Sequence, residues 1–249
     1  MIILNVTGLF KDSFTYPLRD SNKLLFLGAV FIVGGLLTIL PVFISGVLGI
    51  NIALNQQFLL AIITFIVMGI ILFLTSAIIS GYGISVIRKT LFNPDKVPSF
   101  DLVKNLVSGL KLAILSVVYY LIPVAISLLL SYFVNFSIGF IVWILLSTIA
   151  TLLLIVATSR LAETNSLKEA LKIDEVFKDI SKIGIANYIV WIIIYLSIGI
   201  IISFITFIIM FIPIIGVIIG FLAIMPFITM FSARAIGLLY NESKLILNH

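Results

Sequence analysis

The chain has 249 residues, of which 62% are hydrophobic and only 10% are charged. A soluble domain usually carries about 25% charged residues, so this composition argues against a water-soluble enzyme or a nucleic-acid-binding domain. There is no cysteine, which excludes disulfides, thiolate catalysis and cysteine metal sites. The single histidine is His249, and one terminal imidazole builds neither a triad nor a metal centre. We therefore expect no catalytic residue, no metal site and no cofactor.

The sequence contains three long stretches without a charged residue, at 24–87, 112–159 and 183–233. A transmembrane helix needs about 20 apolar residues, so each stretch suits two spans. Each stretch is broken near its middle, by polar residues around Asn51 and Asn135 and by a proline at Pro213. The fold class predicted is thus an all-α, polytopic membrane protein. Its six transmembrane helices form three hairpins, at about 24–46, 58–87, 112–133, 138–159, 187–211 and 214–237.

The basic residues predict the orientation in the membrane. All 15 Lys and Arg lie outside the three uncharged stretches, and the turns inside the stretches carry none. Because Lys and Arg collect on the cytoplasmic side, we expect a multi-pass protein of the cell membrane with cytoplasmic N- and C-termini. The opposite face then has no charge. Its partners are expected in the membrane or the cytoplasm: membrane lipids, a second copy of the chain or a cytoplasmic protein, but not nucleic acid.

A short segment with helical spacing of apolar residues precedes each predicted hairpin, over 6–14, 100–111 and 166–180. Spacings of three and four place apolar side chains on one face, as in amphipathic helices that lie at a membrane surface. In the third segment, Ser166 and Glu169 have the spacing of a capping box. We therefore expect an amphipathic cytoplasmic helix before each hairpin.

Each hairpin also closes on an arginine, at Arg88, Arg160 and Arg234. Together with the preceding segments, this recurrence predicts internal repeats within a single transmembrane domain that covers 1–249. The repeats would span 1–92, 98–163 and 166–240.

Short motifs at the helix ends resemble those of a known family. They are Tyr16-Pro17-Leu18-Arg19-Asp20, Gly81-Tyr82-Gly83 with Ile87-Arg88, Gly109-Leu110-Lys111 with Tyr120, and Arg234 with Gly237 and Tyr240. In these motifs the chain resembles domain-of-unknown-function family 4013, prokaryotic and often archaeal membrane proteins with six spans. The resemblance implies that architecture over nearly the whole chain and brings no established activity or catalytic residue. The chain is also distantly similar to the membrane domain of some glycerophosphodiester phosphodiesterases, but it lacks their catalytic domain.

The three arginines are candidate lipid-phosphate contacts. A guanidinium offers a fork of donors that suits a phosphate, and Arg88, Arg160 and Arg234 would lie at equivalent depths in the inner leaflet. The alternative is that each arginine only anchors the end of its helix. The connection that begins at Arg88 is also net +3, with five basic residues against Asp95 and Asp101, and such segments attract anionic lipid.

Gly216 and Gly220 form a GxxxG pair and are candidate helix-packing residues. Small residues at this spacing let two helices approach closely. The contact would lie either within one molecule or between two copies of the chain.

Functional classes are limited by what the predicted spans lack. None has a charged residue at its middle, and proton-coupled carriers and intramembrane proteases depend on such groups. The leading hypothesis is a non-enzymatic protein that organises lipid or a partner, as a membrane scaffold. The alternative is a transporter or channel for a small neutral or lipophilic solute, lined by Ser and Thr hydroxyls and kinked by prolines. An enzyme acting on lipid headgroups would need acids such as Asp95 and Glu163, which no motif gathers.

Overall fold

The computed structural model describes residues 5–47 and 58–245, and within them every regular element is a helix. The elements are α1 Val6–Thr15, η1 Tyr16–Arg19, α2 Ser21–Val47, α3 Phe58–Phe92, α4 Leu102–Phe133, α5 Phe136–Thr164, α6 Leu167–Ala170, α7 Ile173–Ile183, α8 Ile185–Met210, α9 Ile215–Ile219, the π-helical η2 Gly220–Ile224 and α10 Met225–Leu245. Six stretches are long and apolar enough to cross a membrane. The predictions of an all-helical fold and of six candidate spans are therefore confirmed.

The helix ends follow from local chemistry where the chain turns. Asn135 is the N-cap of α5, and its side-chain Oδ1 accepts a hydrogen bond from the Ser137 amide at 2.8 Å. Between α8 and α9 the backbone turns at Ile214, which has a positive φ of 61°. The turn predicted around Asn51 lies outside the described residues.

Two sequence-based expectations about the short segments are wrong. The segment 100–111 is not a separate surface helix, because α4 starts at Leu102 and continues without a break into the span. Asp101 caps this start by accepting from the Lys104 amide at 3.0 Å, and no proline follows within the next four turns. The capping box is also absent. Ser166 makes no side-chain cap at α6, and the Glu169 carboxylate instead binds Lys172 Nζ at 2.7 and 2.9 Å.

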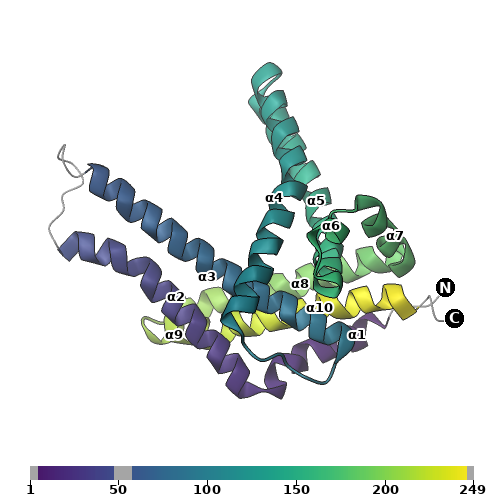
Figure 1. Ribbon diagram of the computed structural model, residues 1–249, viewed down its shortest axis with the longest axis horizontal. Coiled ribbons are helices and arrows are strands. Elements are labelled where there is room, and N and C mark those ends of the chain that lie inside the picture. Colours follow the sequence, from purple (N-terminus) through teal and green to yellow (C-terminus); the bar gives the residue numbers. More distant parts are fainter. Residues whose placement is uncertain (1–4, 48–57, 246–249) are drawn as a thin grey trace.

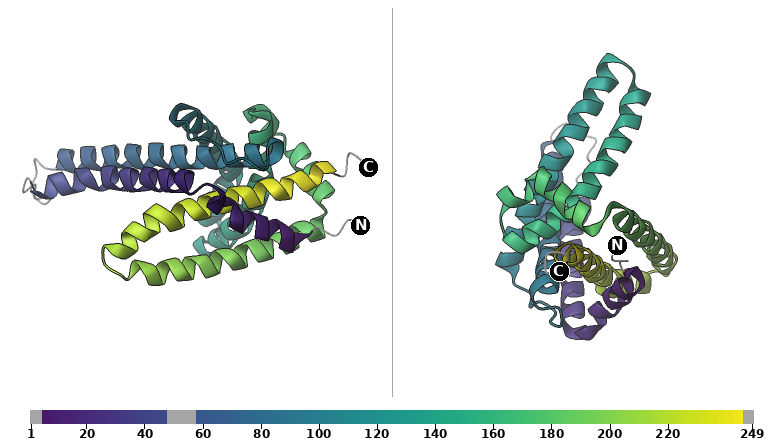
Figure 2. Two further views of the ribbon diagram at one scale, coloured as in Figure 1. Left: turned by 90° about the horizontal axis from the view of Figure 1, so that it is seen from below. Right: turned by 90° about the vertical axis from the view of Figure 1, so that its right-hand side faces the viewer.

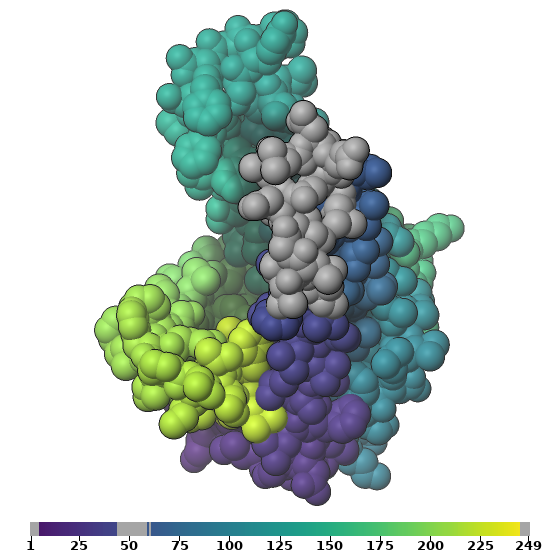
Figure 3. All heavy atoms as spheres, turned by 90° about the vertical axis from the view of Figure 1, so that its left-hand side faces the viewer, coloured from purple at the N-terminus to yellow at the C-terminus, as the bar shows by residue number. Residues whose placement is uncertain are grey.

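The helices converge at one end of the molecule and diverge at the other (Figure 1). Neighbouring helices α2 and α3 run side by side, as do α4 and α5 (Figure 2). The α4–α5 pair leaves the others at a steep angle, and its far end stands apart from α9 when the molecule is seen from the side (Figures 1 and 3). Helix α10 passes through the packed end, where it contacts α3, α1, α7 and α2.

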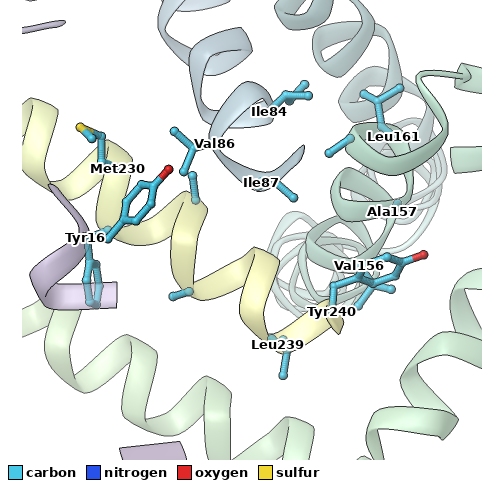
Figure 4. Packing of buried hydrophobic residues seen from close by; sticks show 14 of the residues in the cluster. Tyr16, Ile84, Val86, Ile87, Val156, Ala157, Leu161, Met230, Leu239 and Tyr240 are labelled. Carbon is cyan, nitrogen blue, oxygen red and sulfur yellow. The ribbon is translucent and has the colours of Figure 1, made fainter. Parts of the chain in front are cut away.

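The buried core lies at this packed end. Side chains from α3, α5 and α10 pack there around Val86, Ala157 and Leu239 (Figure 4). Tyr16 and Tyr240 are also buried in the cluster, with exposed fractions of 0% and 1%. Away from it, large apolar side chains are exposed. Examples are Phe43, Phe133, Phe136, Ile200 and Phe211.

Helices α3 and α4 cross closely at two glycines. A Cβ atom built on Gly81 would lie 1.7 Å from the Asn105 carbonyl oxygen. A Cβ atom built on Gly109 would lie 1.7 Å from the carbonyl oxygen of Ala77. Only hydrogen atoms fit at these points, so the backbones touch in the manner of small-residue packing between membrane helices. This crossing fixes how the C-terminal part of α3 faces the start of α4.

Candidate functional site

The charged side chains hold the helix ends of the packed region together. Lys23 Nζ donates to the Val97 carbonyl at 2.8 Å, which ties the start of α2 to the connection between α3 and α4. Lys111 Nζ donates to the Asn165 carbonyl at 2.9 Å and so ties α4 to the end of α5. The segments that lie between the uncharged stretches of the sequence therefore meet in one place.

Arg234 is the most deeply buried of these charges, with 3% of its surface exposed. Its Nε donates to Asp12 Oδ2 at 2.7 Å, and its Nη1 donates to the Pro94 carbonyl at 3.0 Å. The guanidinium also lies 4.7 Å from the centre of the Tyr16 ring. Burial raises the pKa of Tyr16 to about 12, although Arg234 opposes this rise. Arg234 thus joins α10 to α1 and to the connection after α3.

Arg160 joins α5 to α7 in a second network. Its Nη1 lies 2.6 Å from Asp179 Oδ2, and Asp179 is only 4% exposed. The Tyr240 hydroxyl lies 3.2 Å from the same carboxylate oxygen and 2.8 Å from Glu163 Oε2. Lys244 pairs with Glu163 as well. This network holds α7 beneath α5 and α10.

Acidification is expected to weaken the docking of α7. Hydrogen bonds from Lys172 and Lys178 lower the pKa of Glu169 and Glu175 below the ordinary 4.5, and Arg160 lies 3.9 and 4.0 Å from these two carboxylates. Because the folded pKa values are depressed, this stabilisation is present above about pH 4.5 and is lost as the pH falls through the lower folded values. The thermal unfolding temperature should therefore change little between pH 7 and about pH 4.5 and drop modestly as the pH falls further. A Glu169→Gln/Glu175→Gln variant should lose part of that drop, and an unchanged drop would contradict the assignment.

Arg88 differs from the other arginines. Arg19, Arg160 and Arg234 each have a carboxylate within 4.0 Å, whereas Arg88 has none among residues 5–47 and 58–245. Its Nε donates to the Ala162 carbonyl at the end of α5, at 2.7 Å. Arg88 also lines a cavity between the end of α3 and the start of α4.

This cavity, called here the basic cavity, has a volume of about 360 Å³. That lies at the lower end of the range of about 300–1,000 Å³ for small-molecule sites. Its lining comprises Ser85, Arg88, Lys89, Phe92, Asn93, Pro98, Ser99, Asp101 and Lys104. Three cations therefore face one carboxylate, and that carboxylate already caps α4. The wall has hydroxyl and amide groups suited to a polar, negatively charged molecule.

A buried amide adjoins the basic cavity. Ser85, which lines the cavity, donates to Asn105 Oδ1 at 3.1 Å. Asn105 is fully buried, and its Nδ2 has no hydrogen-bond partner in the described structure. Buried donors without a partner are rare in folded proteins because each costs about 1–3 kcal/mol.

Comparison with known proteins gives one match. A family model described as protein of unknown function (DUF4013) matches residues 65–211, more than half of the chain. The chain belongs to the DUF4013 family. No curated protein and no solved structure matches it, so nothing supports the distant similarity to glycerophosphodiester phosphodiesterases. The match includes the glycine motifs of α3 and α4 but not Tyr16 or Arg234. The six apolar helices indicate that this DUF4013 protein is a multi-pass membrane protein.

The structure separates the three arginines that the sequence presents as one set. In this DUF4013 protein Arg160 and Arg234 are bound to carboxylates of the same chain, whereas Arg88 lines the basic cavity. Sequence reasoning missed Asp12 and Asp179 as their partners. Asp12 lies 222 residues from Arg234, and no local pattern relates positions so far apart.

The two candidate packing glycines lie close to the end of α8. A Cβ atom on Gly216 would lie 2.0 Å from the Ile209 carbonyl oxygen, and one on Gly220 would lie 2.4 Å from Met210 Cε. Both glycines therefore let α9 and η2 fold back closely on α8 within one molecule.

Proposed function

We propose that this DUF4013 protein is a non-enzymatic membrane protein that organises lipid around its helix pairs. It would lie in the cell membrane with both termini in the cytoplasm, as the distribution of Lys and Arg predicts. The observation that supports this proposal is the contrast between the two ends of the molecule. One end is packed and charged, and at the other end apolar helix pairs diverge (Figure 1).

The diverging pairs need an apolar environment. Phe133, Phe136 and Phe211 are 74%, 75% and 72% exposed. Exposing apolar surface to water costs about 25 cal/mol of free energy per Å². The hydrocarbon core of a bilayer removes this cost. Because the α4–α5 pair points away from the other pairs, acyl chains would pack against several faces of the same protein. The packed end would then set the spacing of the lipids around it.

The short helices at the charged end supply a second contact with the membrane surface or with a protein. Helix α7 packs Val176 and Ile183 inward and exposes Ile173 and Phe177 at 45% and 52%. An exposed aromatic residue beside lysines is typical of segments at a membrane interface. We assign this face to lipid headgroups, with a cytoplasmic protein or a second copy of the chain as its other possible occupant.

Transport of a small neutral solute is the competing function, and the hydroxyl groups weigh against it. A passage would need hydroxyls from several helices to line one continuous space. Ser76 and Ser80 instead line a groove beside α4, and Ser203 lines a different groove between α8 and α10. The Thr148 and Thr206 hydroxyls bond to carbonyls of their own helices.

Native mass spectrometry of the protein released from a gentle detergent tests this proposal. We expect phospholipid to remain bound in a fixed ratio through repeated detergent washes, and the same spectrum reports the oligomeric state. Proteoliposomes provide the second arm, in which uptake of small neutral solutes is measured against empty vesicles. A lipid-free mass together with solute uptake would overturn the lipid role and support transport.

A further inference from the structure

We propose that the basic cavity binds a phosphate ester, the chemistry that lipid headgroups share with soluble phosphates. The proposal rests on the lipid-organising function and deepens it, because it names the anionic phospholipid headgroup as the class of ligand and gives it a place. The residues that bind the phosphate are Arg88, Lys89 and Lys104.

The three cations that line the basic cavity have no carboxylate partner within the part of the chain that the structure describes. Neither Lys89 nor Lys104 has a carboxylate within 4.0 Å among residues 5–47 and 58–245, and the same holds for Arg88. Other lysines, such as Lys172 and Lys178, are paired with glutamates. Those without an ion pair in the described structure, such as Lys11 and Lys168, do not line the cavity. Three unpaired cations around one hollow repel each other, and an anion between them removes that repulsion.

The guanidinium of Arg88 is held in a fixed position at the cavity. The Ala162 carbonyl holds its Nε at 2.7 Å, so the guanidinium is oriented before a ligand arrives. The Nη groups keep donors for a phosphate, for which a guanidinium is well suited. The guanidinium groups of Arg160 and Arg234 are less available to a phosphate, because Asp179 and Asp12 already bind them.

The position of the cavity relative to the spans favours a lipid as the source of the phosphate. It lies where the span that includes α3 ends, at Phe92. Phe92 is 60% exposed at the edge of the cavity, which leaves apolar surface for the acyl chain of a lipid beside the cations. Ser85 and Ser99 add hydroxyl groups to the lining, which suits the glycerol or sugar part of a headgroup.

The carboxylate of Asp101 opposes an anion in the same cavity and provides a sharp test. Asparagine caps a helix about as well as aspartate, so the Asp101→Asn variant keeps the start of α4 and removes the negative charge. We expect this variant to bind anionic lipid several-fold more tightly. Unchanged or weaker binding would contradict a phosphate in the cavity.

The main experiment titrates delipidated protein with phosphatidylglycerol or phosphatidylcholine and counts bound lipid by native mass spectrometry. The test variant is Arg88→Gln/Lys89→Gln/Lys104→Gln. Its matched control, Lys11→Gln/Lys96→Gln/Lys168→Gln, removes three exposed lysines that have no ion pair within the described residues and lie outside the cavity. Because charge-assisted hydrogen bonds to a phosphate form only at the cavity, the test variant should bind phosphatidylglycerol roughly 100-fold more weakly. The control should stay within a few-fold of the wild type.

A competition arm separates the two sources of phosphate. Inorganic phosphate and glycerol phosphate are added at millimolar concentration to protein that carries phosphatidylglycerol. If the site holds a lipid, neither displaces it; displacement by either would assign the cavity to a soluble phosphate and overturn the lipid headgroup as ligand. If the wild type and both variants retain phosphatidylglycerol equally, the cavity is not the site although the lipid function stands. If none of them retains any lipid, the proposed function fails as well.

Discussion

Replacing Asp12 with asparagine is expected to lower the free energy of unfolding by about 3 kcal/mol. The Arg234 side chain is 4% exposed, and Asp12 supplies its countercharge. Asparagine has nearly the same shape but no charge, so the guanidinium would stay buried without a countercharge, beside the Pro94 carbonyl, the Thr90 hydroxyl and the Tyr16 ring. Loss of one partner of a buried ion pair costs about 3–5 kcal/mol. We expect the lower end of that range because Asp12 is 28% exposed.

Unfolding can be followed by the fluorescence of Trp191 in a Trp143→Phe background, in a denaturant titration in detergent micelles. Trp191 is fully buried at the packed end and lies against Phe10 of α1, so it reports on the docking of α1. Lys178→Gln is the matched control, since that ion pair is exposed and contributes at most about 1 kcal/mol. An Asp12→Asn effect no larger than that of the control would show that the buried pair does not hold the packed end together.

Replacing Gly81 with alanine is expected to destabilise the protein by about 1–3 kcal/mol. In an exposed helix the same change stabilises by up to about 1 kcal/mol. Here the new methyl group would meet the Asn105 carbonyl oxygen at 1.7 Å, so α4 must move away from α3. Gly109→Ala should act in the same way from the other side of the crossing.

Gly69 is the control for this prediction, because it also lies in α3 and a Cβ atom there meets nothing within 4 Å. Gly69→Ala should leave stability unchanged or raise it slightly. Because the crossing also sets the basic cavity, Gly81→Ala should weaken phosphatidylglycerol binding together with stability. Equal thermal unfolding temperatures for Gly81→Ala and Gly69→Ala would contradict the close packing of α3 on α4.

The spans were predictable because hydropathy and charge act locally. Helix α5 starts at Phe136 and helix α8 ends at Met210, both within two residues of the expected positions. The predicted break between the segment 100–111 and the span that follows it is wrong, because α4 is continuous there. The apolar stripe of 100–111 fits a separate surface helix and the first turns of a long transmembrane helix equally well. No proline lies between Asp101 and Leu112, so nothing ends the helix before the span.

The candidate site was less predictable, because the tertiary structure decides which arginines and lysines pair with a carboxylate. The sequence shows an excess of positive charge between α3 and α4 and does not show which side chains share a cavity. Lys96 is exposed outside the basic cavity, while Arg88 and Lys104 lie within it. That division follows from the crossing of α3 over α4. The equivalent positions of the three arginines, each at the end of a hairpin, likewise suggested equal roles. Carboxylates from distant segments pair with Arg160 and Arg234 and give these two a different role from Arg88.

The most direct test of this account is the side of the membrane on which each end of the molecule lies. The chain has no cysteine, so single variants Ser137→Cys and Lys96→Cys can be labelled without background. Ser137 lies in the first turn of α5, beside the turn from α4, and Lys96 lies in the charged connection after α3. In intact cells a membrane-impermeant maleimide should label the Ser137→Cys variant, and it should label the Lys96→Cys variant only after permeabilisation. Labelling of both variants in intact cells, or of Lys96→Cys alone, would contradict a charged cytoplasmic end with helix pairs that cross the bilayer.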